Sequence, residues 1–235
     1  MRKLAFIALG LAFILSASAQ TKNPKPSAKP KPAAPAARLA EIKTDYGTMV
    51  VKLYDSTPLH RDNFIAKVKE KFYDSLLFHR VIQGFMIQGG DPGSKYADSG
   101  VALGGGDAPG DMIPAEFRQE LIHKKGALAM ARTDNPEKAS SNCQFYIVEG
   151  KQYDNNFLNQ MECNVRQGGN VDFYYNDSAR KAYKTIGGTP FLDENYTVFG
   201  EVIKGLDVID KITAVQKDAS DRPLKDVRMK IRMLN

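Results

Sequence analysis

The first regular pattern along the chain is an alternation of apolar and polar side chains over residues 38–55, "RLAEIKTDYGTMVVKLYD". It is interrupted at residues 45–47, and two alternating runs on either side of such a turn predict a β-hairpin. After it, Ser56 or Thr57 can cap a helix, Pro58 suits the first helical position, and apolar residues follow at helical spacing. The sequence therefore predicts one helix directly after the hairpin.

Short apolar runs then dominate the rest of the chain. "FHRVIQGFMIQGG", residues 78–90, predicts two strands separated at Gln83-Gly84, and the glycine-rich residues 89–110 predict a surface loop. Four further strand-like runs follow, at residues 126–132, 143–150, 196–203 and 227–233. A helical pattern covers residues 204–215. Many short strands with two helices indicate a mainly β fold, an antiparallel barrel or sandwich.

Residues 151–190 differ from these strand-like runs, because apolar and polar side chains do not alternate along them. A helix start at Asp177 or Ser178, with a glycine stop after it, indicates that the segment is partly helical. A connection of this length is either functional or an independent excursion, and the pattern leaves both readings open.

Residues 1–19 have the pattern of a secretory signal peptide, with a basic start, an apolar run and small side chains at Ala17 and Ala19. A membrane anchor is the alternative, but the apolar run is shorter than the roughly 20 residues that span a bilayer. We expect cleavage after Ala19, export to the periplasm or another extracytoplasmic space, and no membrane span after cleavage. Residues 20–38, rich in Lys, Pro and Ala, are expected to form an extended linker.

The net charge of +6 comes from this N-terminal part, because residues 1–38 contain seven Lys or Arg and no acidic residue. Residues 39–235 keep 26 basic and 27 acidic groups, so the expected folded domain is nearly neutral. Nucleic-acid binding usually requires a basic face on the domain itself. We therefore expect no nucleic-acid partner.

Cysteines and histidines give no metal pattern. Cys143 and Cys163 are the two cysteines, and in an exported protein a bridge between them is an open possibility. His60, His79 and His123 are scattered, so they do not supplement the cysteines into a zinc site. We expect His60 and His123 to lie on the surface.

The two-residue period of strands brings candidate side chains together. Phe145 and Ile147 point to one face of their strand, which we expect to be core, and the intervening residues point to the other. Arg80 is expected to share a face with Phe78 and Ile82. Parity thus permits one patch that contains Arg80, Met86, Gln88, Gln144 and Tyr146.

Three segments now carry a resemblance. "FHRVIQGFMIQGGDP", "ALAMAR" followed by "CQFYIV", and "FLDENYTVFGEVIKGLDVID" resemble, in order and spacing, the signature segments of the cyclophilin family of peptidyl-prolyl isomerases. The resemblance runs from about residue 41 to 233. It implies a closed eight-stranded antiparallel β-barrel capped by two helices, here a domain over residues 39–235 with an insertion at about 151–188. It implies no cofactor and no metal.

The resemblance also assigns a site. The catalytic arginine of the family falls on Arg80, and the substrate groove falls on His79, Phe85, Met86, Gln88, Ala131, Arg132, Gln144, Tyr146, Phe191, Leu192 and Tyr196. Some positions depart from the family: Phe191 stands where tryptophan is frequent, and Tyr146 where phenylalanine is usual. Tyr196 and Arg132 replace residues that are commonly histidine and asparagine. The implied partners are proline-containing polypeptides, and we expect a monomer.

The implied chemistry explains an arginine among apolar residues. Rotation about an X-Pro bond breaks amide resonance against a barrier of about 18–20 kcal/mol but breaks no covalent bond. A hydrogen bond from Arg80 to the prolyl nitrogen would favour the twisted amide. The alternative is a peptide-binding chaperone or scaffold module whose isomerase activity is incidental. A hydrolase lacks a defensible Ser-His-Asp or Cys-His arrangement.

Overall fold

The computed structural model describes residues 37–234, so the predicted signal peptide and most of the predicted linker lie outside the described residues. Eight strands follow the apolar runs. They are β1 (Leu39–Thr44), β2 (Gly47–Leu53), β3 (Phe78–Ile82), β4 (Met86–Gly89), β5 (Ala127–Met130), β6 (Phe145–Val148), β7 (Val198–Lys204) and β8 (Lys230–Met233). The helices are α1 (Pro58–Lys69), α2 (Asn155–Gln167), α3 (Asp177–Thr185) and α4 (Leu206–Thr213), with short 3-10 turns at Pro92–Ser94 and Pro190–Leu192.

All eight strands form one antiparallel sheet in the order β3-β4-β6-β5-β7-β2-β1-β8, which leaves β3 and β8 as its two edges. The mainly β class is confirmed, but the expected closed barrel is wrong: the sheet is curled and open. No ladder joins β3 to β8 in residues 37–234. The start of β3 and the residue Ser75 before it are linked instead to residues that precede β8, since Phe78 and Ser75 donate backbone hydrogen bonds to the carbonyl oxygens of Val227 and Met229.

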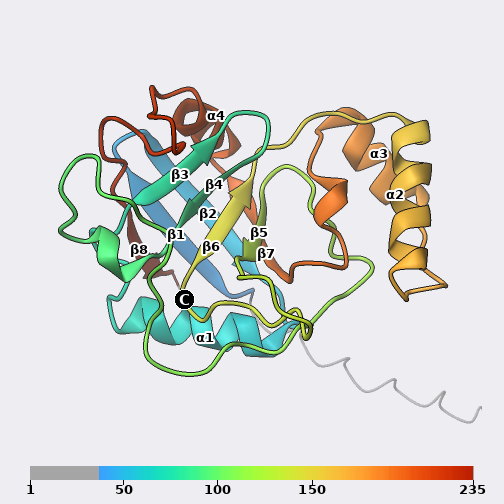
Figure 1. Ribbon diagram of the computed structural model, residues 1–235, viewed down its shortest axis with the longest axis horizontal. Coiled ribbons are helices and arrows are strands. Elements are labelled where there is room, and N and C mark those ends of the chain that lie inside the picture. The colour runs from blue at the N-terminus through green and yellow to red at the C-terminus, as the bar shows by residue number, and fades with distance from the viewer. Residues whose placement is uncertain (1–36, 235) are drawn as a thin grey trace, which may run out of the picture. The chain divides into compact units, whose positions relative to one another are not determined.

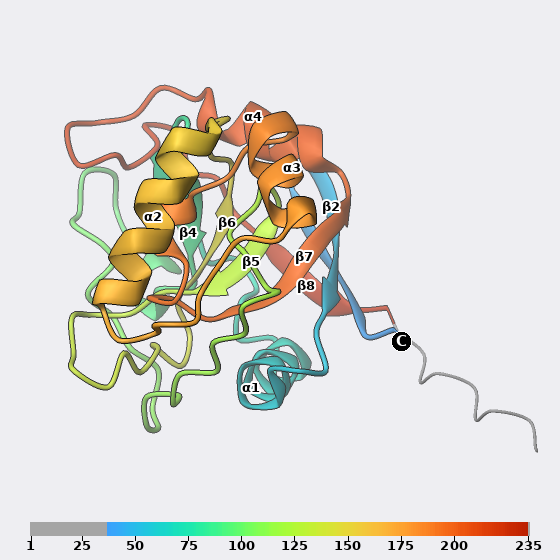
Figure 2. The same cartoon turned by 90° about the vertical axis from the view of Figure 1, so that its right-hand side faces the viewer.

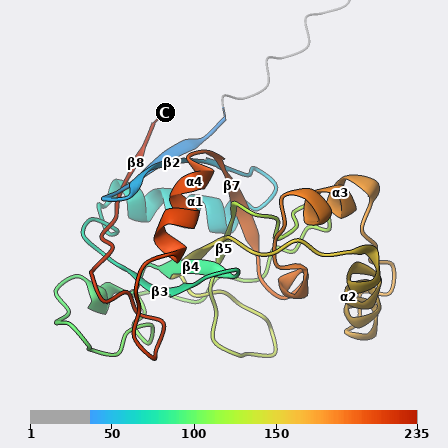
Figure 3. The ribbon, with the colours of Figure 1, turned by 90° about the horizontal axis from the view of Figure 1, so that it is seen from above.

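The inner face of the curled sheet holds the main apolar core. Register places Val81, Ile87, Ile147 and Leu128 side by side across β3, β4, β6 and β5, and all four are fully buried. Helices α1 and α4 lie at opposite ends of the sheet (Figure 1), as expected for the two capping helices. Residues 37–234 contain four helices rather than two, because α2 and α3 form an additional lobe beside the sheet (Figures 2 and 3).

Helix α1 begins where the sequence predicts, with Thr57 at the N-cap position and Pro58 at the first helical position. Thr57 makes no side-chain capping bond. The carboxylate of Glu116 accepts hydrogen bonds from the backbone amides of Leu59 and His60 instead, and its Oε2 atom also lies 2.8 Å from Nδ1 of His60. His60 is therefore fully buried, and its predicted surface position is wrong.

The inserted segment, residues 151–188, is closed at its base by an antiparallel bridge between Lys151 and Gly188. At Gly150, just before the bridge, φ is +71°, and an added Cβ would lie 2.2 Å from the carbonyl oxygen of Gly188. Glycine is therefore required at position 150, where the two ends of the inserted segment meet. An apolar cluster separate from the main core holds the lobe together; it is formed by Leu158, Met161, Phe173, Tyr175, Ala179 and Tyr183, with Ile122 from outside the insertion.

Sequence analysis found only one helix of this lobe. Helix α3 begins at Asp177 as predicted, and its cap is Asn176, whose side chain accepts from the amide of Ala179. Helix α2 was missed. Its signals are Asp154, which caps the helix by accepting from Phe157, and apolar residues at positions 158, 161 and 165.

The two cysteines are both free. Cys143 is fully buried in the sheet region, whereas Cys163 is exposed on α2, so the possible bridge is not formed. Within residues 37–234, none of the helices combines the length and the apolar character needed to cross a bilayer.

Candidate functional site

A polar and aromatic row crosses the outer face of the sheet. Register pairs Arg80 of β3 with Gln88 of β4, and Gln88 with Tyr146 of β6. Directly paired residues of an antiparallel sheet point to the same face, so these three side chains lie together. The adjacent row is the core row that contains Ile87 and Ile147, which confirms the predicted parity of β4 and β6.

A β-bulge at His79 sets the direction of Arg80. Phe78 pairs with Gly89 and Arg80 with Gln88, so His79 is the extra residue of β3. Phe78 consequently points into the core, and the prediction that it shares a face with Arg80 is wrong, because strict alternation does not continue through a bulge.

The same bulge buries His79 away from the groove to which the resemblance assigns it. Its side chain is 3% exposed and does not line the pocket beside Arg80. Burial lowers the pKa of His79 to about 4, and the nearby Asp91 carboxylate offsets only part of that effect. His79 is therefore an uncharged group behind the site.

A hollow of about 120 Å³ lies beside the row on the outer face, and we call it the sheet pocket. Its lining is composed entirely of residues that the sequence predicted: Arg80, Phe85, Met86, Gln88, Ala131, Arg132, Tyr146, Leu192 and Tyr196. The apolar part of the lining belongs to a second cluster, on the outer face of the sheet, that includes Met86 and Tyr146. Phe191 stands at the rim, where its ring centroid lies 5.7 Å from that of Phe85.

The two arginines of the sheet pocket differ in their bonding. Arg132 is held in place: its Nε donates to the carbonyl oxygen of Asn195 at 2.9 Å, and its guanidinium lies 4.9 Å from the ring centroid of Tyr196. Arg80 is half-exposed, and within residues 37–234 its guanidinium forms no hydrogen bond or ion pair. Arg80 therefore presents free donors at the edge of a pocket that combines polar and apolar side chains.

Two glutamines join this row to the glycine-rich loop. Gln88 donates to the side-chain oxygen of Gln144 at 3.0 Å, and the Nε2 atom of Gln144 donates to the carbonyl oxygens of Gly104 and Gly106. Asp91 fixes this part of the loop, because its carboxylate accepts from the amides of Gly104 and Gly106. The loop over residues 89–110 therefore positions Gln144.

Behind the sheet pocket lies a buried polar chain. The hydroxyl of Tyr146 lies 3.0 Å from Nε2 of His123, and Nδ1 of His123 lies 2.7 Å from Oδ1 of Asp193. His123 is 1% exposed and Asp193 is 4% exposed. The predicted surface position of His123 is therefore wrong. Asp193 joins segments that are distant in the sequence, since His123 is 70 positions away.

This chain continues into the inserted lobe. The hydroxyls of Tyr175 and Tyr183 both donate to Oδ2 of Asp193, so the carboxylate is bonded by the insertion on one side and by His123 on the other. Burial raises the pKa of both tyrosines and that of Tyr146, so all three hydroxyls stay protonated and can donate. Sequence reasoning missed Tyr175 and Tyr183. The tyrosine-rich composition of the insertion was their only signal.

Comparison with known proteins agrees with this architecture. The sequence profile described as "Cyclophilin type peptidyl-prolyl cis-trans isomerase/CLD" matches residues 39–232. A putative peptidyl-prolyl cis-trans isomerase of Staphylococcus haemolyticus is 36% identical over 187 residues, which are 79% of this chain and 85% of that protein. A putative bifunctional phosphatase/peptidyl-prolyl cis-trans isomerase of Streptococcus pyogenes is 36% identical over 189 residues, but these cover only 36% of it.

A solved structure shows the same fold. The cyclophilin-type peptidyl-prolyl cis-trans isomerase of Cryptosporidium parvum superposes with a TM-score of 0.59 at 23% identity, covering 85% of this chain and 98% of its own. That protein was also solved in the presence of the dipeptide Ala-Pro, where the TM-score is 0.58. The family profile and the curated relatives together show that the chain belongs to the cyclophilin-type peptidyl-prolyl cis-trans isomerase family.

Proposed function

We propose that this protein isomerises X-Pro bonds of polypeptides at the sheet pocket, with Arg80 as the group that stabilises the transition state. The observation that carries the proposal is the free guanidinium of Arg80 beside a hollow of about 120 Å³ that Phe85, Met86 and Leu192 line in part. That volume is well below the roughly 300–1,000 Å³ of pockets for drug-sized ligands, so it suits a small ring such as that of proline.

The chemistry follows from the electronic change during rotation. When the X-Pro bond twists, the prolyl nitrogen regains a lone pair and becomes a hydrogen-bond acceptor. Arg80 is placed to donate to this nitrogen, and a charged donor strengthens the bond as the lone pair develops. Because the planar amide has no such acceptor, the interaction favours the transition state over both ground states.

The remaining pocket residues hold the substrate. Met86, Tyr146 and Leu192 offer apolar contacts to the proline ring, so that the residue before proline can turn about the fixed ring. Gln88 lies beside Arg80 and is itself oriented by Gln144, so it can bind the substrate backbone. No nucleophile or general base is needed.

The size of the required rate enhancement indicates that both the Arg80 donor and the pocket contribute. Raising the rate from about 10⁻² to about 10³ per second requires roughly 7 kcal/mol of preferential stabilisation. One oriented donor typically supplies about 3–4 kcal/mol, so the pocket has to supply the rest by restraining the proline ring.

Arg80→Ala tests the role of the guanidinium. We expect kcat/KM on a short X-Pro peptide to fall at least about a hundredfold, while the fold is retained because Arg80 is half-exposed and bonds to no other group. Arg80→Lys should recover only part of the loss, since an ammonium lacks the planar fork. Arg232→Ala, on the opposite edge strand β8, is the matched control and should keep full activity.

The same measurement separates the isomerase from a peptide-binding module. An active wild-type protein with an inactive Arg80→Ala variant supports catalysis at this site. Near-normal activity in the variant removes the assigned role of Arg80. A wild-type protein that accelerates no X-Pro peptide but binds unfolded protein would establish the chaperone or scaffold function instead.

We further propose that the protein acts outside the cytoplasm, on exported or folding proteins. The support is the signal-peptide pattern of residues 1–19 and the Lys- and Pro-rich residues 20–38. N-terminal sequencing of the protein from fractionated cells tests this. A mature chain that begins at Gln20 in the extracytoplasmic fraction is expected, and an uncleaved cytoplasmic protein would contradict it.

A further inference from the structure

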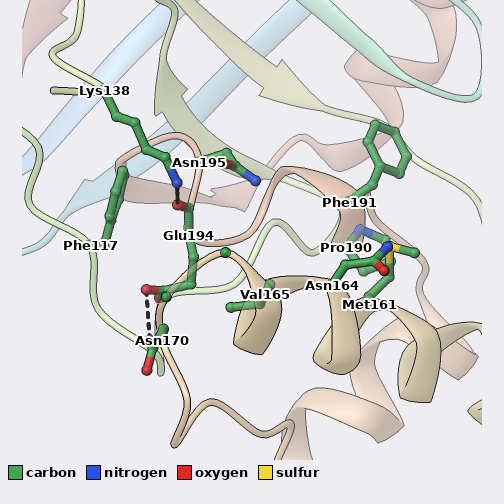
Figure 4. Close-up of a pocket in the computed structure, with 12 residues that line it drawn as sticks. Phe117, Lys138, Met161, Asn164, Val165, Asn170, Pro190, Phe191, Glu194 and Asn195 are labelled. Atoms are coloured by element: carbon green, nitrogen blue, oxygen red, sulfur yellow. Dashed lines mark hydrogen bonds between the residues drawn. The ribbon is translucent and has the colours of Figure 1, made fainter. Parts of the chain in front are cut away.

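A second and larger hollow lies between helix α2 and residues 190–195, and we call it the insertion pocket. Its volume is about 600 Å³. Figure 4 shows α2 forming one side, with Phe117 and Lys138 on the other. Of the site residues predicted from the sequence, only Phe191 lines it. Half of its lining residues, from Met161 to Asn170, belong to the insertion, so the insertion forms this pocket.

The insertion pocket lies next to the sheet pocket, because neighbouring residues of two segments line the two hollows. The segment 190–196 lines both, since Phe191 belongs to the insertion pocket and Leu192 to the sheet pocket. The segment 131–138 does the same with Lys138 and Arg132. The two hollows are therefore neighbours, and Phe191 of the insertion pocket places its ring centroid 5.7 Å from that of Phe85, which lines the sheet pocket.

Apolar side chains and uncharged amides line most of the insertion pocket. Phe117, Met161 and Val165 supply apolar surface, and the side-chain amide of Asn164 is exposed and bonds to no group within residues 37–234. A free amide beside apolar walls matches the backbone and uncharged side chains of an extended polypeptide.

The two charged side chains of the pocket, Lys138 and Glu194, already bond to other residues that line it. The Nζ atom of Lys138 donates to the carbonyl oxygen of Glu194 at 2.9 Å and lies 5.6 Å from the ring centroid of Phe117. The Glu194 carboxylate accepts from Asn170 at 3.0 Å (Figure 4). One positive and one negative group, each already bonded, do not favour a strongly charged ligand.

We infer that the insertion pocket binds the segment of a polypeptide substrate next to the X-Pro bond held in the sheet pocket. This rests on the proposed function of the sheet pocket. The occupant is an extended, apolar stretch of an unfolded chain, and a volume of about 600 Å³ has room for more than one side chain. A short peptide reaches only the sheet pocket, so the insertion selects long unfolded chains.

Filling the insertion pocket tests this. Asn164→Trp places an indole in the pocket from an exposed position of α2, where the fold tolerates a large side chain. Asn159→Trp is the matched control: Asn159 is also exposed on α2 but lies about 140° around the helix, at about 100° per residue. Both variants are assayed on an Ala-Pro tetrapeptide and on the proline-limited refolding of an unfolded protein.

The two substrates should respond differently. We expect kcat/KM of Asn164→Trp to fall about tenfold on the unfolded protein, mainly through KM, because a hydrophobic subsite discriminates by at least that factor. Its rate on the tetrapeptide, and both rates of Asn159→Trp, should equal those of the wild type. Equal rates for Asn164→Trp and Asn159→Trp on both substrates would overturn the inference. A wild type inactive on the tetrapeptide would refute the proposed function itself.

A second measurement needs no variant. An unfolded polypeptide without proline can occupy the insertion pocket but offers no ring to the sheet pocket. It should inhibit the wild type on the unfolded-protein substrate and leave tetrapeptide isomerisation unchanged. Equal inhibition of both reactions, or of neither, contradicts a separate subsite.

A dimer in sedimentation velocity that Asn164→Trp abolishes would assign the pocket to a second copy of the chain and also overturn the inference.

Discussion

The Nε2 atom of His123 lies 3.0 Å from the hydroxyl oxygen of Tyr146, and the two rings are nearly parallel, with an interplanar angle of 12°. Tyr146 forms part of the floor of the sheet pocket on one side and bonds to a buried imidazole on the other. The other ring nitrogen of His123 contacts Asp193, which the inserted lobe bonds through two tyrosines. A continuous chain of hydrogen bonds thus joins the insertion to the pocket floor.

Tyr146→Phe tests the first link of this chain. It removes the hydroxyl and leaves Nε2 of His123 buried without a partner, so the free energy of unfolding should fall by about 1–3 kcal/mol in urea denaturation. Isomerisation of short peptides should persist, because the ring and Arg80 remain. Tyr174→Phe, which removes an exposed hydroxyl, is the control and should change stability by less than about 0.5 kcal/mol. Equal stability of Tyr146→Phe and wild type would show that the contact contributes nothing.

The two tyrosines that bond to Asp193 should act as a pair. Tyr175 and Tyr183 both donate to Oδ2, so either alone still satisfies that oxygen, and each single change to Phe should lower the free energy of unfolding by about 1 kcal/mol. The double variant orphans a buried carboxylate oxygen. We expect its loss to exceed the sum of the two single losses by at least about 0.5 kcal/mol in a double-mutant cycle.

The control for this cycle pairs Tyr183→Phe with Tyr174→Phe, because the exposed Tyr174 does not bond to Asp193. Those two changes should be additive within about 0.5 kcal/mol. Additivity for Tyr175 and Tyr183 as well would mean that the two hydroxyls do not share one acceptor.

The sequence predicted the sheet pocket well because its residues lie on strands and in short motifs. Gln88 and Tyr146 follow from the two-residue period, and the motif around Arg80 identified the chemistry. Arg80 shares a face with Ile82 as predicted but not with Phe78, since the bulge at His79 depends on how β3 pairs with β4. Local periodicity carries no information on such a pairing.

The hydrogen bonds of the buried polar chain could not be predicted from the sequence, for a different reason. His123 and Asp193 are 70 positions apart, and Tyr183 reaches Asp193 from a separate lobe, so the contacts exist only after the insertion packs on the sheet. An isolated histidine or aspartate in a polar segment is most often exposed. His123 and Asp193 are buried instead, and the hydrogen bonds that their side chains form offset the cost of removing these polar groups from water.

The cysteines give a direct test of packing. Cys163 is exposed on α2, whereas Cys143 is buried, and burial raises the pKa of the Cys143 thiol. A thiol reagent should modify one cysteine of the native protein rapidly and the second only after unfolding. Cys163→Ser should abolish the rapid phase. A native protein with no reactive thiol would contradict the two free cysteines.

Protonation of His79 should limit stability in acid. Its pKa is about 4 in the folded protein against 6.5 for an ordinary histidine, because burial disfavours the charged ring; the neighbouring Arg80 and Arg222 act in the same direction and Asp91 opposes them. The unfolded chain therefore binds a proton that the folded chain does not between these two pH values. The stability that depends on neutral His79 is fully present above pH 6.5 and is lost as the pH falls toward 4.

His79→Gln isolates this contribution. The shift corresponds to a loss of up to about 3 kcal/mol in the wild type between pH 6.5 and 4, at about 1.4 kcal/mol per pKa unit. The variant should lack that part of the loss, so the difference in free energy of unfolding between the two proteins should change with pH in this window and stay constant above pH 7. Burial also lowers the pKa of His60, but His60 is present in both proteins and cancels in the difference. A pH-independent difference would show that His79 is protonated as readily in the folded protein as in the unfolded chain.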